Sequence, residues 1–240
     1  MLKFSSQNEK TGKLVGKRFA QKWLRNGRKV YSLDLLSGWA CPFAKECKSK
    51  VIRIGGKSRI QDGPKCKFRC FSASSEVLYP SVYKLRKENF KQLRRAKTTD
   101  RMFRLLYGAL PQDAGIVRIH VGGDFFSQAY FDAWIALAYS RPDILFYAYT
   151  KAIKFWQARQ DRITSNLVLT ASFGGIQDNL IEDFRSVVVV NRKCDARNLP
   201  IDDSDSLAAN PANKRNFALV LHGPQPAGLG ARLVCRRNKK

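Results

Sequence analysis

Short apolar segments alternate with helix-length segments along most of the chain, and this alternation is the feature that most constrains its fold. Strands are expected over residues 29–36, 115–121, 144–150, 166–172, 186–190 and 217–221. Helices are expected over 81–95, 100–109, 128–140, 153–163 and 178–184, and a polar loop over 195–213. Apolar strands joined by helical crossovers are parallel and covered on both faces, so the pattern predicts an α/β fold.

Six strand–helix units are compatible with two architectures. One is a partial (βα)6 barrel and the other is a doubly wound parallel sheet, and both bind ligands at the C-terminal ends of their strands. The chain has 240 residues and 44% apolar side chains. We therefore expect a single α/β domain over 1–240, with a cysteine-rich metal loop at 38–73 and a basic C-terminal tail.

Polar residues and glycines gather where the predicted strands end, and this gathering predicts an active site at one edge of the sheet. The chain has only two histidines, and both lie at such ends. The candidate residues outside the cysteine loop are His120, Gly122, Gly123, Asp124, Thr150, Lys151, Ser172 and His222.

Several of these residues have equally simple structural interpretations. His120 is also consistent with a hydrogen-bonded interior histidine, and Asp124 with the cap of the following helix. Gly122 and Gly123 are also consistent with a tight turn. Lys151 is also consistent with one more surface lysine.

Four cysteines fall within thirty residues: Cys41, Cys47, Cys66 and Cys70. Such clustering favours metal binding in a reducing compartment over disulfide formation. Four thiolates suit either zinc or an iron–sulfur cluster, and the basic residues around them favour the deprotonated form. Because neither short gap between cysteines has the two-residue spacing of structural zinc sites, we expect an iron–sulfur cluster, with zinc as the alternative.

The charge is strongly positive and unevenly distributed. The chain carries 44 basic and 19 acidic side chains, a net charge of +25, and residues 1–110 alone hold 27 and 7, a net of +20. A field of this sign attracts polyanions, so we expect a nucleic acid or a nucleotide-bearing substrate as partner. The alternative is a basic surface that serves only solubility.

No apolar run reaches the length of a membrane span, and the first ten residues lack an apolar signal core. We therefore expect no membrane association and a cytoplasmic location.

Two separated motifs carry a resemblance to a known family. They are Leu36-Ser-Gly-Trp-Ala-Cys-Pro-Phe-Ala-Lys-Glu-Cys47 with Phe68-Arg-Cys-Phe-Ser-Ala73, and His120-Val-Gly-Gly-Asp-Phe-Phe126 with Phe146-Tyr-Ala-Tyr-Thr-Lys151. Over roughly residues 30–225 the chain resembles a phage-encoded family known as gene product 88. That resemblance implies that the protein acts in the cytoplasm of an infected host cell. It implies no particular activity, because the family has none that is settled.

At a greater distance, the layout resembles radical S-adenosylmethionine proteins. This resemblance implies a barrel of that type and a [4Fe–4S] cluster held by Cys41, Cys47 and Cys70. It also implies that Gly122, Gly123 and Asp124 bind the methionine end of S-adenosylmethionine. Thr150, Lys151 and Ser172 would then line its carboxylate or ribose, and His120 and His222 would face the substrate. Two departures from the pattern are the wide spacing of the cysteines and an aspartate where those proteins have a glutamate.

Two functions are favoured over a third, a different metal-dependent enzyme such as a nuclease that uses Asp124, His120 and His222, for which the strand ends offer few carboxylates. The first is a radical S-adenosylmethionine-like enzyme that acts on nucleic acid or a nucleotide. The second is a non-catalytic nucleic-acid-binding protein whose cysteines hold structural zinc or a closed cluster. Cys66 separates them, because a fourth thiolate ligand would leave no iron open for the cofactor.

Overall fold

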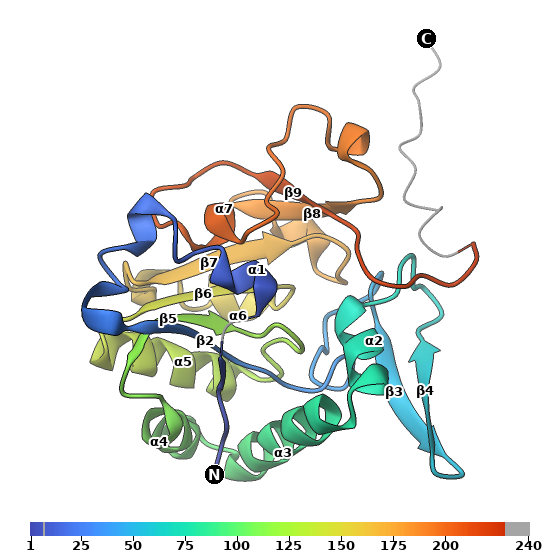
Figure 1. The fold of residues 1–240 in the computed structure, drawn as a ribbon, viewed down its shortest axis with the longest axis horizontal. Helices are drawn as coiled ribbons and strands as arrows, with labels where there is room; N and C mark the ends of the chain where they lie inside the picture. The colour runs from blue at the N-terminus through green and yellow to red at the C-terminus, as the bar shows by residue number, and fades with distance from the viewer. Residues whose placement is uncertain (7, 229–240) are drawn as a thin grey trace.

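A mostly parallel seven-stranded sheet forms the centre of the molecule (Figure 1). The computed structural model describes residues 1–6 and 8–228. The order across the sheet is β1-β2-β5-β6-β7-β8-β9, and every neighbouring pair is parallel except β1 and β2. The strands are β1 (Ser5–Ser6), β2 (Lys29–Leu33), β5 (Ala114–Ile119), β6 (Leu145–Thr150), β7 (Leu167–Ser172), β8 (Ser186–Val190) and β9 (Phe217–Val220).

The six parallel strands follow one another in sequence order, which confirms the predicted α/β fold. A doubly wound sheet would reverse its order at a central switch point, and this sheet shows no reversal. The sheet stays open, since β1 and β9 are not paired to each other. The sequential winding brings the C-terminal ends of all six parallel strands to one edge.

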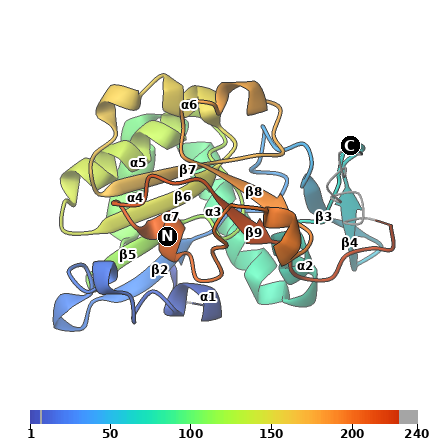
Figure 2. The same ribbon diagram turned by 90° about the horizontal axis from the view of Figure 1, so that it is seen from above.

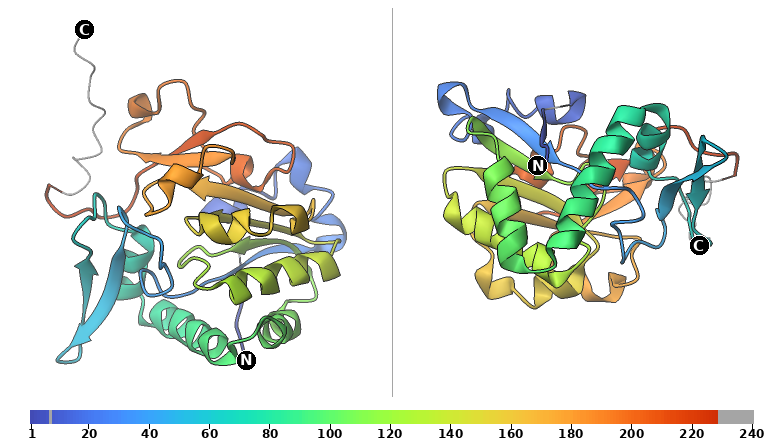
Figure 3. Two further views of the ribbon diagram at one scale, coloured as in Figure 1. Left: turned by 180° about the vertical axis from the view of Figure 1, so that it is seen from behind. Right: turned by 90° about the horizontal axis from the view of Figure 1, so that it is seen from below.

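Three long helices cover one face of the sheet (Figures 2 and 3). They are α3 (Pro80–Ala96), α4 (Thr99–Ala109) and α5 (Gln128–Ser140). The side chain of Ser127 caps α5 by accepting a hydrogen bond from the Tyr130 amide at 3.2 Å. The largest side chains of this core, among them Tyr130, Trp134 and Phe146, are fully buried.

Shorter segments cover the opposite face. The N-terminal segment, which contains α1 (Glu9–Gly12), packs there with α7 (Ser206–Ala209). The predicted loop over 195–213 is therefore not wholly irregular. Ala208 and Ala209 pack against the sheet beside Phe217, and this apolar contact holds one helical turn in place.

The cysteine segment differs most from expectation, because it contains regular structure where a loop was expected. It contains the hairpin β3 (Ser49–Ile54) and β4 (Lys57–Asp62), followed by α2 (Phe71–Leu78). Gly55 and Gly56 supply the positive φ angles of +55° and +76° that a two-residue hairpin turn requires. The hairpin stands beside the main sheet, with α2 between them (Figure 1).

Two predicted helices are shorter than expected. α6 covers Ile153–Gln157 and is followed by a 3-10 turn, because the stretch after it is polar and has no apolar face to bury. Residues 178–184 contain only the 3-10 turn Asp178–Leu180. In the described part of the chain, no helix has the length and apolar content that crossing a membrane requires. The basic C-terminal tail lies outside the described residues.

Candidate metal centre and neighbouring cavities

Three cysteines lie together near the C-terminal edge of the sheet, two from the loop between β2 and β3 and one from the start of α2. Cys41 lies in the turn that follows β2, Cys47 lies just before β3, and Cys70 is the N-cap residue of α2. Glycine is required in the first of these turns. Gly38 has φ of +69°, and a Cβ there would lie 2.5 Å from the Ser49 carbonyl oxygen.

The three thiols lie close to one another in surroundings that are largely buried. Each of these cysteines keeps some solvent exposure, yet the surrounding protein atoms raise the pKa of each thiol. The pKa of Cys70 rises to about 12, mainly through burial and then through the nearby Cys47 sulfur. For Cys41, burial is followed by the carboxylate of Asp124 and the sulfurs of Cys70 and Cys47. The three sulfurs are therefore close enough for their charges to act on one another.

Backbone amides near two of these sulfurs oppose the effect of burial. The amide of Gly38 lowers the pKa of Cys41, and those of Ser72 and Ala73 lower the pKa of Cys70; the Ala73 N–H itself donates to the Cys70 carbonyl oxygen at 3.1 Å. Amides at a helix N-terminus stabilise a thiolate, and such bonds also tune an iron–sulfur cluster. Cys41 and Cys70 are therefore placed to carry negative charge once a cation is present.

Cys66 has a different environment from the other three. It is buried with 6% of its surface exposed, and its thiol donates to the Phe68 carbonyl oxygen at 3.0 Å. Its sulfur also lies 3.7 Å from the Ser49 hydroxyl. The thiol is thus sealed into the base of the hairpin by its own hydrogen bonds.

Four of the predicted cofactor-binding residues form one hydrogen-bonded network across the ends of β5, β6 and β7. We call Asp124, Thr150, Lys151 and Ser172 the strand-end network. The Asp124 carboxylate accepts from the Thr150 hydroxyl at 2.7 Å and from the Lys151 amide at 2.9 Å. The Lys151 ammonium donates to the Ser172 hydroxyl at 2.7 Å and to the Phe173 carbonyl at 2.6 Å.

The strand-end network adjoins the thiols. Burial raises the pKa of Asp124 although three hydrogen bonds oppose the shift. Burial also raises the pKa of Cys47, whereas the charge of Lys151 lowers it. Lys151 is the cation whose charge reaches this sulfur, so the strand-end network lies near the cysteines.

Gly122 and Gly123 connect the end of β5 to Asp124, and both positions are sterically restricted. A Cβ on Gly122 would lie 2.2 Å from the Ser72 hydroxyl and 2.9 Å from the Arg86 guanidinium. Gly123 has φ of +94°, and its Cβ would lie 2.7 Å from that of Leu35. This turn therefore packs closely against Ser72 of α2, two residues after Cys70.

His120 points into the helix-covered core and not into a cavity. Its Nε2 lies 3.0 Å from the Tyr130 hydroxyl, and its ring packs against Phe125. Its backbone has φ of +70°, and its Nδ1 has no hydrogen-bond partner. Burial, and then the charge of Arg118, lowers the pKa of His120 to about 3.

The opposite face of the sheet carries a second buried network that the sequence did not point out. We call Arg118, Asp205, Tyr147, Tyr149 and Lys10 the inner-face network. The Asp205 carboxylate forms ion pairs with the Arg118 guanidinium at 2.5 Å and the Lys10 ammonium at 2.9 Å. It also accepts a hydrogen bond from each of the two tyrosine hydroxyls at 3.0 Å. The available signal was Arg118, a charged residue in the middle of an apolar strand.

A cavity of about 800 Å3 opens beside the inner-face network. Its lining includes Lys10, Arg118, Phe71 and His222, so it adjoins the residue that follows Cys70. The rings of Phe71 and His222 lie 4.5 Å apart between their centroids. The size suits a nucleotide-sized ligand, and of the two histidines only His222 lines this cavity.

Among the described residues, no three His, Cys, Asp or Glu side chains converge tightly enough to hold a single metal ion. A zinc ion would need its thiolates at about 2.3 Å from one point. An iron–sulfur cluster places each thiolate on a different iron, so its ligands stand further apart. Cys41, Cys47 and Cys70 therefore lie near one another without forming a single-ion site.

The comparisons with known proteins give one match. A family model described as Gene product 88 matches residues 2–240. No curated protein and no solved structure matches the chain.

Proposed function

The chain belongs to the gene product 88 family, and on that premise we propose that it is an iron–sulfur protein that uses S-adenosylmethionine to modify nucleic acid or a nucleotide. One observation carries the proposal. The thiols of Cys41, Cys47 and Cys70 gather at the C-terminal edge of the parallel strands, near enough to Asp124 and Lys151 for these charges to shift the pKa values of Cys41 and Cys47. This is the edge at which folds of this kind place their chemistry.

In this proposal Cys41, Cys47 and Cys70 hold a [4Fe–4S] cluster and Cys66 does not. Buried thiols with raised pKa values are stable as thiolates only beside a cation, so binding of the cluster would couple to loss of their protons. When bound, a cluster with one open iron supplies an electron to S-adenosylmethionine. The amides of Gly38, Ser72 and Ala73 would hold the thiolate charge.

The other predicted residues have roles that follow from their positions. Gly122 is buried against Ser72 and Arg86, so within this turn the partly exposed Gly123 would meet the methionine end of the cofactor. Asp124 would orient the ends of β5 and β6 through Thr150 and Lys151, with Ser172 fixing the ammonium of Lys151.

The substrate would enter the cavity lined by Phe71 and His222. His222 would contact it there. His120 would act as a positioning residue, because its ring is held by Tyr130 inside the core.

Anaerobic purification followed by iron and sulfide analysis tests the proposal. We expect about four irons per chain, a brown colour and a spin-resonance signal of the reduced protein that changes when S-adenosylmethionine is added. Cys41→Ser, Cys47→Ser and Cys70→Ser should each lose most of the iron. Cys66→Ser is the matched control and should keep it.

Two results would overturn the enzyme proposal. A protein that stays iron-free after reconstitution would remove the cluster. Loss of iron in Cys66→Ser to the same degree as in the other three variants would indicate a closed four-cysteine site. That second result would favour the alternative, a non-catalytic nucleic-acid-binding protein with a structural zinc or closed iron–sulfur site.

A further inference from the structure

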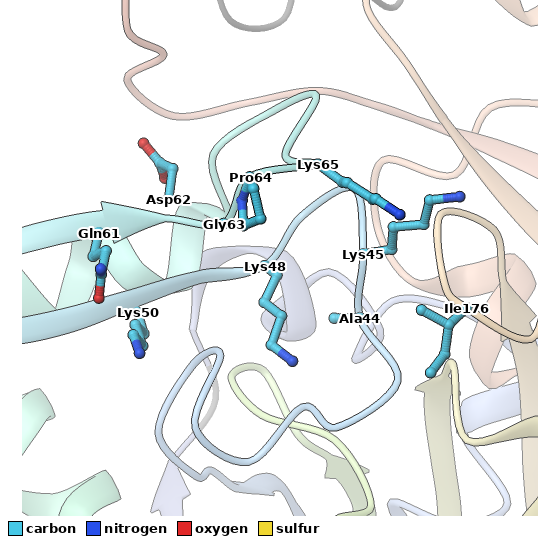
Figure 4. Close-up of a pocket in the computed structure, with 10 residues that line it drawn as sticks. All are labelled: Ala44, Lys45, Lys48, Lys50, Gln61, Asp62, Gly63, Pro64, Lys65 and Ile176. Atoms are coloured by element: carbon cyan, nitrogen blue, oxygen red, sulfur yellow. The ribbon is translucent and has the colours of Figure 1, made fainter.

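A groove lined by four lysines lies beside the cysteine site, between the segment that carries Cys47 and the β3–β4 hairpin. We call Lys45, Lys48, Lys50 and Lys65 the lysine groove; they line a cavity of about 380 Å3 (Figure 4). Lys45 and Lys65 extend toward the same end of the cavity, Lys48 lies between the ends, and Lys50 lies at the other end (Figure 4). The four ammonium groups therefore follow a line and do not form a single cluster.

The charge of this groove is not neutralised by the protein. None of its four lysines takes part in an ion pair with another described residue. The lining contains a single carboxylate, Asp62, and it pairs with Arg69 at 2.5 Å. Four positive charges held along one groove without counter-charges attract an extended polyanion.

Exposed apolar side chains stand at both ends of the lysine groove. At one end, the Lys50 ammonium lies 4.5 Å from the centre of the Trp39 ring, which is 49% exposed. At the other end, Ile176 lines the groove and is 60% exposed. A line of cations flanked by an exposed aromatic ring is the combination that binds a single strand, because the cations track the backbone while a base stacks on the ring.

We infer that the lysine groove binds one strand of single-stranded nucleic acid and leads it past Cys47 toward the cysteine site. This inference rests on the nucleic-acid part of the proposed function and names the surface that would hold the substrate. Lys45 and Lys48 flank Cys47 in sequence, so a strand in the groove passes directly beside that cysteine. The small volume of the groove suits one backbone and not a duplex.

The test is fluorescence anisotropy with a labelled 12-nucleotide strand at several salt concentrations, with DNA and RNA forms of one sequence. The variant K45Q/K48Q/K50Q/K65Q removes the groove charges. The matched control K22Q/K84Q/K91Q/K97Q removes four exposed lysines elsewhere and so makes the same change in net charge.

We expect the groove variant to bind at least about tenfold more weakly than the control variant near 0.1 M salt. The slope of log affinity against log salt should become shallower by about 3, since each backbone contact on a single strand contributes about 0.7. Equal affinities for the two variants would overturn the inference. Tighter binding of a duplex than of either single strand would overturn it as well.

Trp39→Ala separates stacking from charge. The affinity of this variant for the labelled strand should fall about fivefold or more. The slope of log affinity against log salt should stay unchanged, because stacking releases no counterions. An unchanged affinity would remove Trp39 from the binding surface. Far-ultraviolet circular dichroism checks that each variant is folded.

The same titration is repeated on Cys41→Ser, which should lack iron. Strand binding without iron would support the groove independently of the cluster. If the unmodified protein retains its iron but does not bind the strand, the cluster proposal stands and the inference about the lysine groove is overturned.

Discussion

Two buried polar networks, one on a face of the sheet and one at the C-terminal ends of its strands, balance their charges differently. In the inner-face network Asp205 meets the cations Arg118 and Lys10 directly. Burial alone would raise the pKa of Asp205, but these two charges and the Tyr147 hydroxyl hold it below its usual value. In the strand-end network the pKa of Asp124 is raised by burial, and the pKa values of the three neighbouring thiols are raised too.

The difference shows what each network lacks. The inner-face network contains its own compensating cations and is complete without a ligand. The strand-end network and the three thiols offer up to four anionic groups, with Lys151 as the cation among the residues that act on them. Because their pKa values are raised, the three thiols keep their protons when no ligand is bound, and under the proposed function cluster binding would release these protons.

The first way to break this comparison is Asp205→Asn, for which we expect the largest effect. The substitution leaves the Arg118 guanidinium buried without its carboxylate, so the free energy of unfolding should fall by about 3–5 kcal/mol. Urea denaturation of iron-free protein measures the change. A loss below about 1 kcal/mol would mean that the inner-face network does not depend on its ion pair. Arg118→Met combined with Asp205→Asn should recover part of the loss, because it removes the stranded charge.

His120 lies between the two networks and gives a pH dependence. Its pKa is about 3 in the folded protein and about 6.5 when unfolded, so only the unfolded state gains a proton as the pH falls below 6.5. Stability contributed by neutral His120 is therefore complete above pH 6.5 and is lost as the pH falls toward 3. Between pH 7 and pH 5 the free energy of unfolding should fall by about 2 kcal/mol more in the unmodified protein than in His120→Asn.

Asparagine suits this test because it tolerates the positive φ at position 120. The second histidine offers a control, because His222 lines a cavity and is exposed. His222→Asn should retain most of the pH slope. Equal slopes in the unmodified protein and His120→Asn would contradict the prediction.

Asp124→Asn tests the strand-end network and should cost less than Asp205→Asn. The amide replaces one acceptor by a donor that faces either the Thr150 hydroxyl or the Lys151 amide, a loss of about 1–2 kcal/mol. No buried cation is left stranded, since Lys151 keeps its bonds to Ser172 and Phe173. If charge compensation distinguishes the two networks, this variant should also retain less iron than Asp205→Asn after reconstitution. Equal retention would count against Asp124 facing the cluster.

The sequence was sufficient for the parallel sheet and for the edge that carries the candidate site. Apolar runs such as Ser186–Val190 and the helix pattern of Gln128–Ser140 match the structure at both boundaries, because burial of those side chains decides the local fold. Placement of Asp124 and Lys151 beside each other followed from the parallel winding alone. Whether these residues bind a cofactor stays a prediction.

Other parts depended on contacts between distant segments and were not predictable in the same way. The hairpin of Ser49–Asp62 had a local signal, the Gly55–Gly56 pair between alternating residues, but the surrounding charge made the segment resemble a loop. The position of Asp205 had no local signal. Its partners lie 56 to 195 residues away along the chain, from Tyr149 to Lys10, and only the folded sheet brings them together.

Lys10→Gln should have the smallest effect and sharpens the comparison most closely. Lys10 is the partially exposed partner of Asp205, with 26% of its side chain exposed, so solvent already screens much of this pair. Its removal should cost less than about 1 kcal/mol, because Arg118 and the two tyrosines still hold the carboxylate. Urea denaturation in parallel with Asp205→Asn measures the difference. If Lys10→Gln instead lowers the free energy of unfolding as much as Asp205→Asn, the inner-face network needs both cations. The buried Arg118–Asp205 pair would then not be enough to distinguish this network from the strand-end network, which has one lysine.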